Sequence, residues 1–215
     1  MTVMAKICGI NDAVAMQAAV DAGASHVGLV FYPPSPRAVT PEQAAALAPA
    51  AAAKAIRTGL FVDPDDGLID AVLSQVPLEL LQLHGKESPA RVAAIKERTG
   101  RKVMKVIRVG GTSDIDGANA YLKVADWLMF DALPPEEMKN ALPGGNAIPF
   151  DWTLLAGREW PLPWMLAGGL NADNVAEAVR LSGARVVDTS SGVEDAPGRK
   201  SPEKIRAFLA AVSAL

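Results

Sequence analysis

The chain of 215 residues is about 50% hydrophobic and carries a formal net charge of -3. A chain of this length buries one sizeable core, and α/β barrels of this size remain single domains, so we expect one domain over residues 1–215. Without a basic excess, nucleic acid is not expected as a partner. The first ten residues hold no apolar signal core, and every apolar run is shorter than the roughly 20 residues of a membrane span. We therefore expect a cytoplasmic protein that does not enter a membrane.

Metal-binding and disulfide patterns are missing from the sequence. A single cysteine, Cys8, cannot form an internal disulfide, and the two histidines, His26 and His84, are too far apart to form a recognisable ligand cluster. The sequence thus favours an enzyme without a tightly held metal.

Eight short runs with β-branched residues alternate along the chain with Ala-rich helical stretches, which is typical of repeated βα units. Eight units in this length have about 27 residues each, as in a compact single (β/α)8 TIM barrel, and this is the α/β fold we predict. The expected strands are Val3 to Cys8, His26 to Phe31, Ile56 to Val62, Leu78 to Leu83, Val103 to Val109, Trp127 to Asp131, Trp164 to Ala167 and Arg185 to Asp188.

Helix boundaries between these strands can also be predicted. The capping box from Thr40 to Gln43 starts the second helix, and the pairs Ser88-Pro89 and Ser201-Pro202 start the fourth and the eighth. Gly23 and Gly183 are expected to end helices in the left-handed conformation. The segment from Leu133 to Pro149, rich in Pro, Gly and Asn, is expected to be a long functional loop.

An open doubly wound sheet is the alternative architecture, because it also alternates strands and helices and binds phosphate at helix N-termini. It requires a Gly-rich fingerprint after the first strand. Here the double glycine Gly168-Gly169 and the segment Ser190-Ser191-Gly192 follow the seventh and eighth strands, where barrels bind phosphate. The barrel is therefore favoured.

Catalytic groups of barrels lie where strands end at the top face. Cys8 ends the first strand beside a glycine, although a buried structural cysteine remains an alternative. Asp131 ends the sixth strand, and alternation places it on the same face as Met129, so it points into the barrel mouth if Met129 fills the barrel. A turn-capping role for this aspartate is the alternative.

Further side chains at the strand ends are candidates for binding. Three prolines stiffen the loop that presents Arg37, and such rigidity suits bidentate recognition of a carboxylate. His84 after the fourth strand could line the same mouth, with a structural histidine as the alternative. His26 begins its strand and has no expected function. Asn171 is interpreted as the cap of the seventh helix.

Taken together, these segments resemble the phosphoribosylanthranilate isomerase family, and they occur in the family's order along the whole chain. No single motif is specific, but seven in register are. They are Lys6 to Ile10, Phe31 to Arg37, Gln82 to Gly85, Asp131, Phe150 to Trp152, Leu166 to Leu170 and Ser190 to Glu194.

The resemblance implies an Amadori rearrangement of N-(5-phosphoribosyl)anthranilate to its 1-deoxyribulose 5-phosphate isomer in tryptophan biosynthesis, without a cofactor. Asp131 would be the general acid and Cys8 the general base. Arg37 would face the anthranilate carboxylate. The remaining expected contacts to this phosphorylated substrate are His84, Gly168, Gly169, Asp188, Ser190, Ser191 and Gly192. A monomer or weak homodimer is expected.

This chain departs from the family pattern in the loop after the sixth strand, where Gly144-Gly145-Asn146-Ala147 replaces the frequent Gly-Gly-Thr-Gly, and at Thr189, where valine is frequent. Three alternatives stay open: another phosphosugar barrel enzyme, a non-catalytic barrel that binds a phosphorylated ligand, and a bifunctional isomerase. Another phosphosugar enzyme should show metal-ligating histidines and aspartates, or catalytic lysines, at its strand ends, and this sequence lacks that histidine set. A non-catalytic barrel has no need of Cys8 and Asp131 together. The chemistry of a bifunctional isomerase resembles a pair of aspartates, whereas here the first strand ends in a cysteine.

Two expectations concern the barrel interior. Lys6 shares the parity of Cys8, and the first and eighth strands are neighbours in a closed barrel, so Lys6 is predicted to pair with Asp188. Lys6 and the two anion-binding helix ends are also expected to lower the pKa of the Cys8 thiol, and partial desolvation to raise the pKa of Asp131. A minority form with a thiolate and a protonated acid would also suffice.

Overall fold

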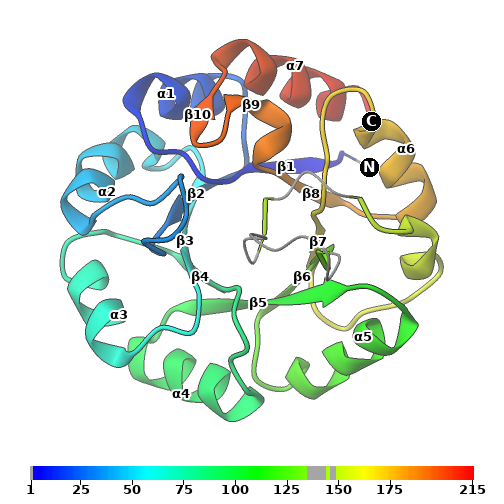
Figure 1. The fold of residues 1–215 in the computed structure, drawn as a ribbon, viewed down its shortest axis with the longest axis horizontal. Helices are drawn as coiled ribbons and strands as arrows, with labels where there is room; N and C mark the ends of the chain where they lie inside the picture. The colour runs from blue at the N-terminus through cyan, green and yellow to red at the C-terminus, as the bar shows by residue number, and fades with distance from the viewer. Residues whose placement is uncertain (1, 135–143, 146–148) are drawn as a thin grey trace.

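A computed structural model describes residues 2–134, 144–145 and 149–215. Eight parallel strands form a closed barrel in the order β1 to β8, with helices around the outside (Figure 1). The predicted TIM barrel and its eight strands are confirmed. The strands are β1 (Met4–Ile7), β2 (His26–Val30), β3 (Ile56–Phe61), β4 (Leu80–Leu83), β5 (Lys102–Val109), β6 (Trp127–Ala132), β7 (Trp164–Leu166) and β8 (Val186–Thr189).

The outer ring consists of α-helices and short 3-10 helices that pack on the barrel. No helix in the described ranges is long and apolar enough to cross a bilayer. The α-helices are α1 (Ala13–Asp21), α2 (Pro41–Leu47), α3 (Asp66–Leu73), α4 (Pro89–Thr99), α5 (Thr112–Gly117), α6 (Val175–Ser182) and α7 (Pro202–Ser213), and the 3-10 helices are η1 (Ala48–Ala51), η2 (Ala118–Tyr121), η3 (Trp152–Leu155) and η4 (Ser191–Val193).

The predicted helix boundaries are largely confirmed. Thr40 forms the capping box of α2 with Gln43, and the hydroxyl groups of Ser88 and Ser201 accept the N–H groups of the third residues of α4 and α7. Gly23 and Gly183 have φ values of 86° and 74°, which favour glycine over any other residue.

Two expectations about helices are wrong. Between β6 and β7 the described residues form only the four-residue η3 instead of a full α-helix, since prolines at 149, 161 and 163 and Gly157 interrupt this stretch. Helix α6 begins at Val175 with Asn174 as its cap residue, three residues later than predicted. Asn171 instead accepts hydrogen bonds from the N–H groups of Asp173 and Asn174, so it caps the turn of residues 172–174 that leads into α6.

Buried side chains fill the barrel interior. An apolar cluster contains Met129 and side chains from the other strands, all buried: Leu80, Met104, Val106, Met165, Ala167 and Val186. Lys6, Gln82 and Asp188 are buried polar side chains, and Gln82 Nε2 lies 3.5 Å from the Met129 sulfur. Met129 therefore fills the barrel, and the alternation along β6 directs Asp131 toward the mouth, as predicted.

A hairpin outside the barrel was not predicted. Strands β9 (Glu194–Ala196) and β10 (Arg199–Lys200) pair antiparallel directly after η4. Figure 1 shows the hairpin between α1 and α7, where the first and last helices of the chain lie side by side. The first and last βα units of the chain are thus in contact, both through α1 and α7 and through the hydrogen bond from Asn11 to the Gly198 carbonyl in the hairpin. The expected loop from Leu133 to Pro149 lies mostly outside the described residues.

Candidate active site

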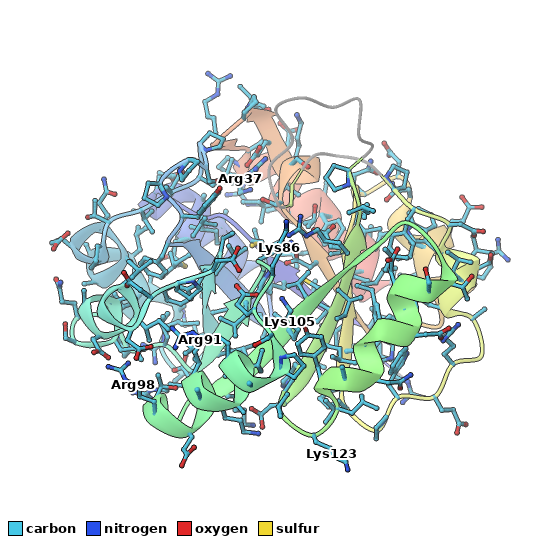
Figure 2. The ribbon with its side chains drawn as sticks, turned by 60° about the horizontal axis from the view of Figure 1, so that its bottom comes forward. Arg37, Lys86, Arg91, Arg98, Lys105 and Lys123 are labelled. Carbon is cyan, nitrogen blue, oxygen red and sulfur yellow. The ribbon has the colours of Figure 1, made fainter. Side chains whose placement is uncertain are left out.

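One cavity opens at the carboxyl ends of the barrel strands. Its lining includes nine of the ten predicted site residues: Cys8, Arg37, His84, Asp131, Gly168, Gly169, Asp188, Ser190 and Ser191. The tenth, Gly192, packs against the segment after β7, since a Cβ atom there would lie 2.0 Å from the carbonyl oxygen of Leu170. Figure 2 shows Arg37 toward this end of the barrel and Lys123 at the opposite end. The expected constellation is thus assembled in one place.

Cys8 follows β1 and is held by a backbone hydrogen bond of 2.9 Å from its N–H to the carbonyl of Thr189. Burial raises the pKa of its thiol, and this effect outweighs the charge of Lys6, which lowers it. Lys6 does lower the pKa of the thiol, as expected. The expectation that this pKa is lowered overall is wrong, because burial raises it by more. A thiolate at Cys8 is a minority species at neutral pH.

The predicted pair of Lys6 and Asp188 is confirmed. The two residues are register partners in β1 and β8, and Lys6 Nζ lies 2.8 Å from Asp188 Oδ1 with no exposed surface on the lysine side chain. Burial opposes charge on both: it raises the pKa of Asp188, whereas the pKa of Lys6 rises to about 12 because Asp188 and Cys8 outweigh burial. We regard the pair as ionic, since a buried ammonium at this distance requires a charged acceptor.

Asp131 has a polar neighbour at each carboxylate oxygen. Its Oδ1 accepts the N–H of Ala132 at 2.9 Å, and its Oδ2 lies 3.2 Å from His84 Nε2, although without the alignment of a hydrogen bond. On the far side of the imidazole, Gln82 Nε2 lies 3.2 Å from His84 Nδ1. A donating Gln82 leaves the proton of a neutral imidazole on Nε2, which faces Asp131.

The described part of the loop after β6 lies directly on this pair. A Cβ atom at Gly144 would lie 2.6 Å from His84 Cε1 and 2.7 Å from Asp131 Oδ2. At Gly145, with φ of 75°, a Cβ atom would lie 2.6 Å from Arg37 Nη1. The double glycine therefore allows the backbone to approach three predicted site residues at once.

The segments after β7 and β8 present backbone groups to the cavity. Gly168 and Gly169 have φ values of 93° and 64°, and Ser191 begins the short helix η4. The first N–H groups of a helix lack acceptors within the helix, so this end can face an anion. Thr189 Oγ1 donates to the carbonyl of Leu170 at 2.6 Å and ties the two segments together.

Arg37 is oriented differently from the expectation of bidentate recognition of a ligand carboxylate. Its Nε and Nη2 donate to the two oxygens of Glu194 at 2.8 and 2.9 Å, and Nη2 also donates to the carbonyl of Gly145 at 3.2 Å. The fork of the guanidinium is therefore taken by a carboxylate of the chain itself. Among the described residues Nη1 has no hydrogen-bond acceptor, and Arg37 lines the cavity.

Three residues around the site were not given roles from the sequence: Gln82, Glu194 and Lys200. Glu194 ends the motif from Ser190 to Glu194, and Gln82 begins the motif from Gln82 to Gly85, so membership of these motifs could have indicated a role for both residues. Lys200 lies in no such motif. Within the described ranges, no group of three or more His, Cys, Asp and Glu side chains is arranged to hold a metal ion.

Comparison with known proteins gives one consistent result. Residues 5–211 match the family described as N-(5'phosphoribosyl)anthranilate (PRA) isomerase. N-(5'-phosphoribosyl)anthranilate isomerases of Paramagnetospirillum magneticum and Rhodospirillum centenum are 59% and 56% identical, with 98% and 100% of this chain and 97% and 100% of theirs covered.

Solved structures agree with the sequence comparison. Phosphoribosyl anthranilate isomerase from Thermotoga maritima matches with a TM-score of 0.88 and 34% identity over 100% of both chains. A phosphoribosyl anthranilate isomerase in complex with reduced 1-(o-carboxyphenylamino)-1-deoxyribulose 5-phosphate matches with a TM-score of 0.83 and 32% identity, again over 100% of both chains.

Proposed function

Since the chain belongs to the N-(5'-phosphoribosyl)anthranilate isomerase family, we propose that Cys8 and Asp131 are the base and the acid of its reaction. The chain is an isomerase of tryptophan biosynthesis and performs the Amadori rearrangement of N-(5'-phosphoribosyl)anthranilate. The observation that supports the assignment is that a thiol after β1 and a carboxyl at the end of β6 line the same cavity.

The acid step takes place at the furanose ring oxygen. Asp131 donates its proton to this oxygen, the bond between the ring oxygen and C1 breaks, and the nitrogen lone pair forms the C1=N bond of a protonated imine. The carboxylate left behind is stabilised by the Ala132 N–H, and by a hydrogen bond from His84 once the imidazole aligns with Oδ2. His84 thus steadies the acid and lines the substrate cavity.

The base step takes place at C2. The Cys8 thiolate removes the C2 proton, the electrons of this C–H bond form C1=C2, and the electrons of the C1=N bond return to nitrogen, which neutralises the protonated imine to an amine. The Cys8 thiol then returns a proton to C1, while the C2 hydroxyl gives its proton to the Asp131 carboxylate and becomes the ketone, so that both residues regain their starting protonation states. Because burial raises the pKa of the thiol, we propose that the active form is the minority with a thiolate and a protonated acid. The ammonium of Lys6 favours that thiolate.

The two anionic ends of the substrate require two binding sites. A relative binds a reduced product that carries both a carboxylate and a phosphate. We propose that the carboxylate meets Arg37 through Nη1, and that the phosphate meets backbone N–H groups of Gly169, Ser191 and Gly192. Gly168, Asp188 and Ser190 complete the contacts on that side of the cavity.

For the assembly, a monomer or weak homodimer in the cytoplasm is our proposal. The Thermotoga maritima relative is described both as dimeric and as generated monomers, so the family tolerates either state. Only five large apolar side chains are exposed in the part of the chain that the structure describes, and they are Met4, Val14, Ile56, Leu133 and Leu215. Sedimentation equilibrium over a range of protein concentrations distinguishes the two states.

Turnover is the direct test of the function. Purified protein is mixed with freshly prepared N-(5'-phosphoribosyl)anthranilate, and the expected result is an enzyme-dependent loss of anthranilate-type fluorescence. The Cys8→Ser, Asp131→Asn double variant serves as control for binding without reaction. If the fluorescence lost never exceeds one equivalent of substrate per wild-type protein molecule, the chain binds the substrate without turning it over. That result would identify a binding protein rather than an enzyme.

A further inference from the structure

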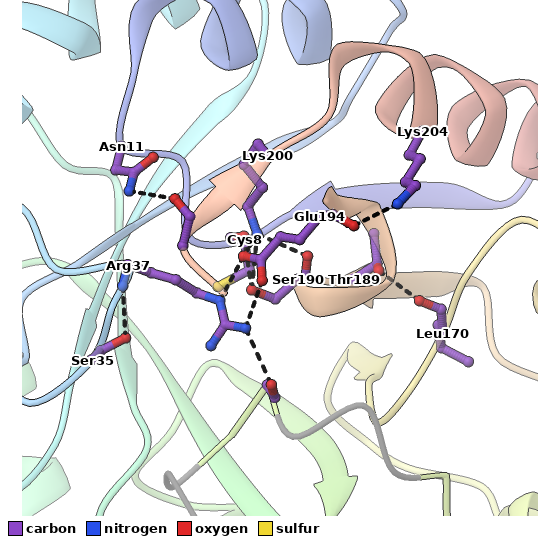
Figure 3. Close-up of polar contacts among 12 residues, drawn as sticks. Cys8, Asn11, Ser35, Arg37, Leu170, Thr189, Ser190, Glu194, Lys200 and Lys204 are labelled. Atoms are coloured by element: carbon purple, nitrogen blue, oxygen red, sulfur yellow. Dashed lines mark hydrogen bonds and ion pairs between the residues drawn. The ribbon is translucent and has the colours of Figure 1, made fainter. Parts of the chain in front are cut away.

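A buried charge cluster outside the acid and base connects the carboxylate end of the cavity to the phosphate end. It consists of Arg37 from the loop after β2, and Glu194 and Lys200 from the hairpin β9–β10 (Figure 3). All three are buried, and Lys200 has no exposed side-chain surface. No role in the reaction as described above uses Glu194 or Lys200.

Glu194 is the centre of this cluster. Its Oε1 accepts Arg37 Nε at 2.8 Å and Lys200 Nζ at 2.7 Å, and its Oε2 accepts Arg37 Nη2 at 2.9 Å. Two buried cations therefore share one carboxylate. Removing that carboxylate would leave both cations without a counter-charge, which is costly in a buried site.

Lys200 continues the connection into the phosphate segment. Its Nζ also donates to the carbonyl of Ser190 at 2.8 Å and to Ser190 Oγ at 3.1 Å. Ser190 Oγ in turn donates to the carbonyl of Cys8 at 3.1 Å. Each proton of the ammonium thus has an acceptor, and two of the three acceptors belong to the residue that precedes η4.

The hairpin is fixed against the loop that carries Arg37. Glu194 and Lys200 are register partners across it. Its turn contains Gly198, where a Cβ atom would lie 2.3 Å from the carbonyl oxygen of Pro36, and the Gly198 carbonyl accepts Asn11 Nδ2 at 2.9 Å. The hairpin is therefore attached both to the loop that carries Arg37 and, through Asn11, to the segment after β1.

We propose that Glu194 and Lys200 are positioning residues that hold the Arg37 guanidinium and the Ser190 to Gly192 segment at a fixed separation, matched to the carboxylate and the phosphate of one substrate. Glu194 occupies the fork of Arg37 and leaves Nη1 for the substrate carboxylate. Lys200 fixes the backbone from which the phosphate is bound. This inference rests on the proposed binding roles of Arg37 and the Ser190 to Gly192 segment.

The experiment separates positioning from folding by comparing Glu194→Gln, Lys200→Met and the matched control Lys204→Met. Lys204 belongs to α7 and also contacts the hairpin, but among the described residues its ammonium contacts only the Glu194 carbonyl and the Asp195 carboxylate. Circular dichroism and thermal unfolding identify the folded variants. For these, kcat and KM are measured with the substrate, and the inhibition constant is measured with inorganic phosphate.

We expect Glu194→Gln to raise KM about tenfold or more with kcat within about threefold, since orientation of a binding group is lost and the acid and base remain. Lys200→Met is expected to raise the inhibition constant of phosphate about fivefold, and Lys204→Met to change neither quantity more than about twofold. If Glu194→Gln does not fold, Lys200→Met decides: an inhibition constant of phosphate within about twofold of wild type in the folded variant would overturn the inference.

Non-additivity provides the readout that a purely structural role would not move. If Glu194 acts on the carboxylate through Arg37, the double variant Arg37→Ala, Glu194→Gln should raise KM no further than Arg37→Ala alone. Multiplied effects, or a folded Glu194→Gln variant with KM within about twofold of wild type, would overturn the inference. An unchanged KM in Arg37→Ala would instead contradict the proposed function of Arg37 itself.

Discussion

The two ends of the cavity solve different chemical problems with different parts of the chain. At the acid and base end, the functional atoms are side chains: Cys8, Asp131 and the imidazole of His84, each buried. At the phosphate end, the proposed donors are backbone N–H groups of glycine and serine in the segments after β7 and β8. The first end depends on the protonation of side chains, among them the Cys8 thiol, whose pKa burial raises, while the second depends on backbone shape. Substitutions should therefore affect the two ends through different kinetic constants.

The largest expected effect comes from the side-chain end. Cys8→Ser replaces a thiol with a far weaker acid, and Asp131→Asn removes the proton donor while keeping its shape. Each should lower kcat by about a hundredfold or more, because general acid or base catalysis contributes 10²–10⁴-fold. Substrate binding should survive in both, as measured by fluorescence titration. Near-normal turnover in either variant would exclude that residue as the acid or the base.

A smaller effect is expected from the backbone end. Gly169→Ala introduces a side chain at a φ of 64°, and the resulting strain of roughly 1–2 kcal/mol should raise KM about tenfold. Ser191→Ala should change KM less than about threefold, since its backbone N–H remains. Inorganic phosphate should compete with the substrate in the wild type.

The matched control for this end is Gly100→Ala. Gly100 caps α4 with a φ of 62° and nothing within 4 Å of an added Cβ atom, so it carries the same backbone strain far from the cavity. Its variant should lose stability without a change in KM. If Ser191→Ala proved more harmful than Gly169→Ala, or if neither phosphate nor sulfate inhibited, phosphate binding by the backbone would be wrong.

The smallest effect on turnover is expected at the bottom of the barrel, where His26 begins β2. Burial, and then the charge of Lys6, lower the pKa of His26 from 6.5 to about 4. The folded state therefore resists a proton that the unfolded chain accepts. The stability that this residue contributes is complete above pH 6.5 and is lost as the pH falls toward 4, by about 3 kcal/mol in total.

Urea unfolding at pH 7 and pH 4.5 measures this contribution as the difference between wild type and His26→Gln. The variant should lose the part of the pH dependence that falls in this window, while its KM and kcat at neutral pH stay near the wild-type values. Identical pH dependence in the two proteins would show that His26 takes up its proton equally well in the folded state.

The sequence was sufficient to predict the strands and the location of the site, because both follow from local patterns. Strand ends carry Cys8 and Asp131, and the alternation along β6 is enough to direct Asp131 into the mouth. The same parity argument predicted the pair of Lys6 and Asp188 across 182 positions, since barrel closure makes β1 and β8 neighbours.

The side-chain partners within the site could not be predicted in the same way. Arg37 was expected to reserve its fork for a ligand, but Glu194, 157 positions later, occupies it. Nothing near either residue in the sequence specifies this pairing, because it depends on how the hairpin β9–β10 packs on the loop after β2. The hairpin itself had a signal, the turn dipeptide Pro197-Gly198. The net rise in the Cys8 pKa likewise depends on burial, which cannot be weighed from sequence spacing.

The support of Arg37 by the hairpin also has a consequence for the order in which the protein folds. Residues that bind the two ends of one substrate come from the first and the last quarter of the chain, so their contacts require closure of a very long loop. Contacts of such sequence separation are expected late in folding. During synthesis, the nascent chain can pair its early strands before the hairpin has left the ribosome, but it cannot yet hold substrate. Recovery of substrate affinity during refolding would therefore report the final closure of the barrel.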